Sequence, residues 1–369
     1  MRIGIMLRHY DQHGGGVRVY TRELLRAMLD LGTEHEFVFM YKNSSLCGNY
    51  KNDPEVAELA FTGNIIWWDQ VEVPKAVRRH AIDVLYNPKY SIPLSVKCPT
   101  AWVCHGLDWY VMPQASRFID RMSHRFLVPR YAHKADAIVA VSEITRQHVH
   151  EFLKVPLDKV HTIYSGVGAG FWTRADAQAV DELNKRYDLP ERFFLYSGAI
   201  YPPKNFTRLI KAYAQVGPKL GIPLVIAGGE NRFLSEHELK VPEQLGLGHW
   251  VRWLGWVDPS LLPVLYQRAS ALLLPSLFES YGLPIVEAMA AGTPVLTADR
   301  YGTKEIAGNA ALLVNPESID SIADGMSRII DDEQLRIELI AAGSDRARDL
   351  TWQRCAQQTL AVLEGIAAK

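Results

Sequence analysis

Two carboxylates in the C-terminal half, Glu279 and Glu287, are separated by seven residues. A buried run ends at Pro275, a loop carries Glu279 and Gly282, and a helix is expected from about Pro284, because proline suits the first helical turn. Each carboxylate offers about four lone-pair sites, so the two can accept hydrogen bonds from several sugar hydroxyls. Glu287 alone would be interpreted as an acidic residue that stabilises a helix N-terminus. Together with Glu279 and the loop between them, it predicts a ligand site.

A second candidate is Lys204, which follows a strand end and a Gly/Pro-rich loop at the start of an expected helix. A cation beside free backbone N–H groups at such a junction is suited to bind phosphate. A solvated surface lysine is the alternative.

Two features of the N-terminal half are ambiguous. The loop His13-Gly14-Gly15-Gly16 opens a helix, where backbone N–H groups suit an anion, but a flexible turn explains it equally well. Val19 breaks the spacing G-x-G-x-x-G, so a dinucleotide oxidoreductase is not indicated. His105 directly follows a strand, where it can donate a hydrogen bond or titrate near neutral pH, or it is a loop histidine without a role.

These residues need parallel strands to position them. Apolar runs alternate with stretches of helical period, which predicts two doubly wound α/β domains with parallel sheets. The expected strands are Ile3–Leu7, Phe37–Tyr41, Val84–Tyr86, Thr100–Val103, Ile138–Val141, Phe193–Tyr196, Leu224–Ala227, Val251–Leu254, Ala271–Leu274, Val295–Thr297 and Leu312–Val314. Ligands bind outside the carboxyl ends of such strands, so two facing domains would form a cleft.

The expected boundaries divide the chain into four parts. A first domain spans 1–168, a linker 169–190 and a second domain 191–349, and a C-terminal helix in 350–369 is expected to pack on the first domain.

The composition is that of an ordinary globular protein, with 40 Lys and Arg against 41 Asp and Glu. This balance does not favour nucleic acid as a partner. The four cysteines form no C-x-x-C pair, and no leader or spanning segment is found. These features predict a cytoplasmic protein that can still touch the inner membrane face.

Residues 117–134 interleave cations with apolar side chains. One interpretation is a surface helix with a basic outer face, and the other is a helix that docks on anionic lipid.

The segment from Phe278 to Val295, FESYGLPIVEAMAAGTPV, resembles the retaining glycosyltransferases of family 4, whose E-x7-E motif is matched by Glu279 and Glu287. The resemblance extends over most of the chain and implies the GT-B fold of two Rossmann-like domains. It looks closest to bacterial mannosyl- and rhamnosyltransferases. The implied reaction moves a hexose from a nucleotide-diphosphate sugar, with GDP-mannose as the expected donor, to a glycan or polyprenyl-linked acceptor.

The family also implies roles for individual residues. Glu279 would hold hydroxyls of the donor sugar, and Lys204 would neutralise the departing diphosphate. His105 would contact the donor sugar near its 6-hydroxyl and border the reacting centre. Glu287 would hold the ribose. The remaining implied donor contacts are Gly15, Gly16, Gly198, Trp253, Gly255, Ser280, Tyr281, Gly282 and Leu283.

The sequence departs from the family at two positions. Many members carry arginine where this chain has Ala199 or Pro203. An alternative is therefore a catalytically weak or inactive nucleotide-sugar-binding protein, and another is an enzyme that uses a UDP- or dTDP-sugar. No metal-binding motif is placed near the expected diphosphate, so no cofactor and no metal are expected, and catalysis would rest on Lys204 and backbone dipoles.

Overall fold

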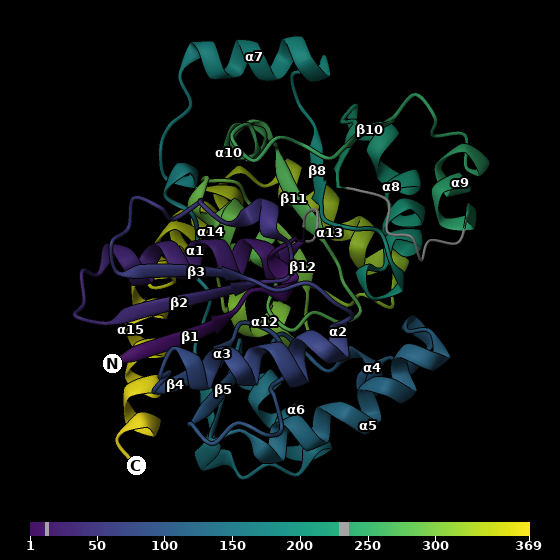
Figure 1. Cartoon of the computed structure of the whole chain (residues 1–369). Coiled ribbons are helices and arrows are strands. Elements are labelled where there is room, and N and C mark those ends of the chain that lie inside the picture. Colours follow the sequence, from purple (N-terminus) through teal and green to yellow (C-terminus); the bar gives the residue numbers. More distant parts are fainter. Residues whose placement is uncertain (12–14, 229–235) are drawn as a thin grey trace. The chain divides into compact units, whose positions relative to one another are not determined.

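The computed structural model describes residues 1–11, 15–228 and 236–369. The chain divides into two compact units, the first made of Met1–Gly166 with Trp352–Lys369 and the second of Val167–Thr351 (Figure 1). Each unit is a parallel sheet with helices, which confirms the predicted fold class of two α/β domains.

The first unit holds a seven-stranded parallel sheet in the order β3-β2-β1-β4-β5-β6-β7. The order reverses between β1 and β4, and such a switch point is where loops at the carboxyl ends diverge to admit a ligand. The strands are β1 (Arg2–Met6), β2 (Glu36–Tyr41), β3 (Val56–Ala60), β4 (Val84–Asn87), β5 (Thr100–Cys104), β6 (Ala137–Ala140) and β7 (Val160–Thr162).

Helices of the first unit cover this sheet, and the last helix of the chain is one of them. Helix α15 contacts both α1 and β4 (Figure 1). Its first residue, Trp352, packs edge-on against Tyr20 of α1. The helices are α1 (Gly16–Asp30), α2 (Ile65–Trp67), α3 (Val73–Arg79), α4 (Asp108–Val111), α5 (Phe118–Lys134), α6 (Glu143–Leu153) and α15 (Trp352–Ala367).

The second unit holds a six-stranded parallel sheet in the order β10-β9-β8-β11-β12-β13, which reverses between β8 and β11. Its strands are β8 (Phe194–Ser197), β9 (Leu224–Ala227), β10 (Val251–Gly255), β11 (Ala271–Leu274), β12 (Val295–Ala298) and β13 (Leu312–Val314). Its helices are α7 (Ala177–Tyr187), α8 (Phe206–Leu220), α9 (Glu236–Gln244), α10 (Leu262–Arg268), α11 (Leu283–Ala290), α12 (Tyr301–Ala307), α13 (Ile319–Asp331) and α14 (Glu333–Arg348).

All eleven predicted strands are present, with ends shifted by one residue at most, because continuous apolar runs of this kind are buried on both faces. Two further strands were not predicted. The edge strand β3 contains Glu58, which interrupts the apolar pattern, and the edge strand β7 is only three residues long. Their pairing comes from neighbouring strands rather than from their own composition.

No helix in the described ranges combines the length and the apolar character needed to cross a membrane.

Candidate functional site

In the second unit, Lys204 and Glu279 lie together at the carboxyl edge of the sheet. Lys204 ends the short turn that follows β8, and Glu279 lies on the loop that follows β11, the neighbouring strand. The Lys204 ammonium donates to Oε1 of Glu279, and the two side chains are only 10% and 11% exposed. The alternative of a solvated Lys204 is therefore wrong, and the switch point of the sheet carries a nearly buried ion pair.

Backbone contacts lock the two loops to each other. The N–H of Leu277 donates to the carbonyl of Pro203 at 2.7 Å, which joins the Glu279 loop to the Lys204 turn. Ser276 Oγ donates to Glu279 Oε1 at 3.2 Å. The buried amide of Asn205 donates to the Pro275 and Pro316 carbonyls at 2.9 and 2.6 Å. These bonds hold the ion pair in place before any ligand binds.

Glycines let the backbone approach the ion pair. Gly198 has a φ of 137°, and a Cβ there would lie 3.7 Å from the Lys204 ammonium. Gly302 faces the Glu279 loop, because its N–H donates to the Glu279 carbonyl at 2.9 Å and a Cβ would lie only 2.4 Å from the Ser280 carbonyl oxygen. The peptide groups of these loops are thus brought close to the charged pair.

Glu287 has a separate partner. It is the fifth residue of α11, and it accepts a hydrogen bond of 2.9 Å from the Tyr266 hydroxyl of α10. Burial, with the Glu287 charge second, raises the pKa of Tyr266 well above its ordinary value, so the phenol stays a donor. Glu287 is partly exposed at this edge.

The start of α11 forms the remainder of this edge. Gly282 has a φ of 97° and precedes Leu283, the first helical residue, while Tyr281 is buried and Ser280 is partly buried. The first N–H groups of a helix have no partner within the helix, so this N-terminus suits an anion.

The predicted base-binding stretch lies at the end of β10. Trp253 is 41% exposed, and its ring packs 5.6 Å from that of Phe206, centroid to centroid. Gly255 follows a register shift in the strand and accepts a 2.8 Å hydrogen bond from the Gly228 N–H.

The first unit carries the remaining predicted residues. Gly15 has a φ of 94° and caps the N-terminus of α1, which begins at Gly16, and both are exposed. The other two loop residues, His13 and Gly14, lie outside the described residues.

His105 follows β5, and its ring lies edge-on to Tyr20 with centroids 4.8 Å apart. Its Nε2 lies 2.7 Å from the Pro88 carbonyl, which can only accept, so Nε2 carries the proton. Burial lowers the pKa of His105 to about 4, although the Pro88 bond opposes this. Of the two possibilities that the sequence left for His105, the structure shows the donated hydrogen bond, while desolvation disfavours the imidazolium and with it titration near neutral pH.

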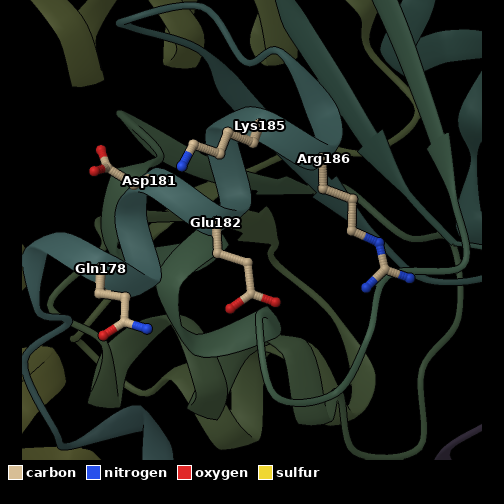
Figure 2. Close-up of a pocket in the computed structure, with 5 residues that line it drawn as sticks. All are labelled: Gln178, Asp181, Glu182, Lys185 and Arg186. Carbon is tan, nitrogen blue, oxygen red and sulfur yellow. The ribbon is translucent and has the colours of Figure 1, made fainter.

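Elsewhere in the second unit, a surface hollow runs along α7 (Figure 2). All of its lining residues are polar and on that one helix, and none of them belongs to the predicted site: Gln178, Asp181, Glu182, Lys185 and Arg186. Opposite charges four positions apart are the usual pattern of a solvated helix face.

Two family models together match most of the chain. The model described as glycosyltransferase family 4 matches residues 14–169, and the one described as glycosyl transferases group 1 matches residues 181–346. This chain is a family 4 glycosyltransferase. Both E-x7-E glutamates and Lys204 of this glycosyltransferase lie in the second matched range.

Its relatives in sequence include two proteins of Escherichia coli. It is 26% identical to the O-antigen chain mannosyltransferase B over 293 residues, which cover 77% of this chain and 75% of the relative. It is 30% identical to the serotype-specific mannosyltransferase WbdA over 274 residues, 72% of this chain but only 33% of WbdA. The glycosyltransferase thus corresponds to about a third of that longer protein.

Solved structures share the fold. The sucrose-phosphate synthase of Thermosynechococcus elongatus superposes with a TM-score of 0.79 at 20% identity, over 100% of this chain and 99% of its own. Anabaena HepE in complex with UDP-glucose superposes with a TM-score of 0.79 at 18% identity, over 99% and 100% of the two chains. Both are GT-B glycosyltransferases, which confirms the predicted fold.

Sequence reasoning missed the residues that hold this site in position. Asn205 precedes α8, and its side-chain amide ties together the loops after β11 and β13, which lie far from it in the sequence. The partners of Tyr266 and Gly302 are also distant in the sequence, so no local pattern distinguishes these residues. Ser276 lies only three residues before its partner Glu279, but serine on a loop is too common to indicate the contact.

The protonation state of His105 can be tested directly. We expect the imidazole of the glycosyltransferase to remain the neutral Nε2–H tautomer from pH 8 to 5 and to titrate near pH 4, because burial disfavours its charge. A ¹H–¹⁵N NMR titration of ring nitrogens measures this, with His105→Gln identifying the signal. A midpoint near 6.5 would contradict the expectation.

Proposed function

We propose that this glycosyltransferase transfers mannose from GDP-mannose, with retention of configuration, to a glycan of a bacterial O-antigen or related surface polysaccharide. Relatives named as O-antigen mannosyltransferases support the sugar and the pathway class. The observation that carries the proposal is the nearly buried Lys204–Glu279 pair beside the N-terminus of α11.

In this proposal the donor separates the ion pair. The diphosphate takes the place of the Glu279 carboxylate as the partner of Lys204, and the released carboxylate accepts hydrogen bonds from the sugar hydroxyls. The Lys204 ammonium is held in place before the donor binds, is poorly solvated, and would lie close to where negative charge develops on the leaving group. Such an arrangement stabilises a developing charge most. The bond between the anomeric carbon and the β-phosphate oxygen breaks, with its electrons going to that oxygen. The acceptor oxygen bonds to the anomeric carbon on the same face, and its proton passes to the departing phosphate.

The other predicted residues complete donor binding in this scheme. Glu287, oriented by Tyr266, accepts from the ribose hydroxyls. The α11 N-terminus at Gly282 and Leu283 supplies N–H groups for the diphosphate. The stretch from Trp253 to Gly255 supports the base.

We further propose that the reaction needs no metal ion. Lys204 and the helix N-terminus would supply the stabilisation that a divalent cation supplies in other transferases. Arginine is absent at Ala199 and Pro203, so one ammonium would carry the whole side-chain contribution.

Two alternatives remain for the reaction. A nucleotide-sugar-binding protein without turnover is motivated by the same missing arginines, while the intact Lys204–Glu279 pair favours an enzyme. A UDP- or dTDP-sugar is the other possible donor, and HepE, of similar fold, was solved with UDP-glucose.

We also propose that α5 docks on an anionic membrane, where a polyprenyl-linked acceptor would be presented. Four apolar residues of this helix are exposed by about half or more: Phe118 by 66%, Ile119 by 79%, Met122 by 49% and Phe126 by 60%. Arginines alternate with them, and the Arg130 guanidinium lies 3.6 Å from the Phe126 ring centroid. A purely basic outer face would not expose these side chains, whereas a lipid interface takes both kinds.

Replacing Lys204 by methionine should lower kcat by about 10²–10³-fold while GDP affinity falls only a few-fold, because the charge matters most as the leaving group departs. Steady-state kinetics and GDP titration measure the two effects. The exposed Lys211→Met on α8 is the matched control. Lys204→Met leaves the nearly buried Glu279 carboxylate without its partner, which can destabilise the fold. The double variant Lys204→Met/Glu279→Gln removes both charges and so separates loss of the lysine from a folding defect. Equal losses in kcat and affinity would restrict Lys204 to binding.

The donor and metal proposals are tested together on the purified protein. GDP-mannose should raise the melting temperature more than UDP- or dTDP-sugars, because ligand binding stabilises the folded state by mass action. Slow hydrolysis of GDP-mannose should persist in excess EDTA. If EDTA abolishes turnover and added Mg²⁺ restores it, metal independence is refuted. If GDP-mannose binds but is not turned over at all, the non-catalytic alternative is favoured.

Charge reversal on α5 tests the membrane proposal. We expect Arg121→Glu/Arg125→Glu to reduce co-sedimentation with phosphatidylglycerol vesicles about tenfold or more, since each basic residue near such a surface contributes roughly 1 kcal/mol. Arg78→Glu/Arg79→Glu on α3 is the matched control, as both arginines are exposed. Circular dichroism checks folding, because Arg121 also donates to the Pro113 carbonyl. Unchanged sedimentation of the α5 variant would refute docking by this helix.

A further inference from the structure

The first unit also presents a lysine at the carboxyl edge of its sheet. Lys89 lies two residues beyond β4, and its backbone N–H donates to the Asn87 side chain at 3.0 Å, which fixes the turn. The side chain is half-buried, and its ammonium lies 5.4 Å from the Tyr90 ring centroid. Within the described part of the chain, this ammonium makes no hydrogen bond and no ion pair.

The carboxylate whose charge acts on Lys89 is that of Asp108, and the two form no ion pair in the described residues. Asp108 accepts hydrogen bonds from backbone N–H groups at the start of α4, including that of Trp109. The nearby Arg8 has its own partner, because it forms a 2.7 Å ion pair with Asp69 in which both side chains are nearly buried. A half-buried ammonium without a directly contacting carboxylate is costly to desolvate, and such groups cluster at functional sites.

The surroundings of Lys89 are those of a polar ligand site. Burial, and after it the charge of Arg8, lowers the pKa of Lys89 to about 8, while the charge of Asp108 opposes this shift. The ammonium therefore remains mostly charged at pH 7. His105, whose Nε2–H donates to the carbonyl of Pro88, is neutral and leaves Nδ1 as an acceptor. A cation and an uncharged acceptor thus lie on adjoining loops, after β4 and β5.

We propose that Lys89 binds an anionic group, a phosphate or a carboxylate, carried by the acceptor, beside the reacting centre that His105 is expected to border. This inference rests on the proposed function in one respect, since it assigns the donor diphosphate to Lys204 and so leaves Lys89 for the second substrate. The two lysines differ in a way that fits this division. Lys204 has an internal carboxylate that its ligand must displace, whereas Lys89 has none.

The test is binding of inorganic phosphate to the full chain, with saturating GDP present so that the donor site is occupied. NMR chemical shifts of the backbone amides of Lys89, Tyr90 and Gly106 report the site. We expect saturable shifts of these amides on addition of phosphate. In Lys89→Met the Kd for phosphate should rise about tenfold or more, because one charge-assisted hydrogen bond is lost. In Lys89→Arg, which keeps the charge, the Kd should stay within about threefold of the original.

Lys97→Met is the matched control, because Lys97 is exposed on the same β4–β5 connection, and it should leave the Kd unchanged. Absence of shifts at these amides, or equal Kd values for Lys89→Met and Lys97→Met, overturns the proposal. If GDP alone removes phosphate from this site, Lys89 belongs to the donor and the acceptor assignment is wrong. GDP binding and GDP-mannose turnover are measured separately, so failure of the proposed function is distinguishable from failure of this site.

Discussion

A nearly buried ammonium–carboxylate pair, Lys204 with Glu279, is the constraint around which the second unit is organised. Two opposite charges in a poorly solvated place are tolerated only with close contact and further hydrogen bonds. The structure supplies both, through Ser276 at 3.2 Å and through the backbone bond from Leu277 to Pro203 that ties the two loops. The loops after β8 and β11 are therefore one rigid assembly, and this assembly forms the ligand edge.

The sheet topology explains why these loops meet. Strands β8 and β11 are neighbours in the sheet although β9 and β10 lie between them in the sequence. The reversal of strand order at this point brings Lys204 and Glu279 together across 75 residues of sequence. The first unit has the same reversal of strand order between β1 and β4. In that unit Lys89 and His105 follow the neighbouring strands β4 and β5.

The two units treat their polar groups differently. In the second unit the nearly buried Lys204 has Glu279 as a direct partner, whereas in the first unit enclosure lowers the pKa of His105 and keeps its imidazole neutral. Desolvation disfavours the charged imidazole because His105 has no carboxylate among its hydrogen-bond partners in the described residues. A neutral His105 with its proton on Nε2 can accept at Nδ1 but is not a general acid near pH 7.

The sequence by itself determined the two parallel sheets and most of the ligand edge. Continuous apolar runs predicted eleven strands, and the Pro-Ile-Val-Glu segment predicted α11, because these patterns depend on neighbours in sequence. Tertiary structure alone decided that Lys204 pairs with Glu279, that Tyr266 orients Glu287 and that Asn205 joins two distant loops. It also decided the protonation of His105. Pairing, desolvation and close backbone approach, as at Gly302, depend on groups far apart in the chain, so no local pattern records them.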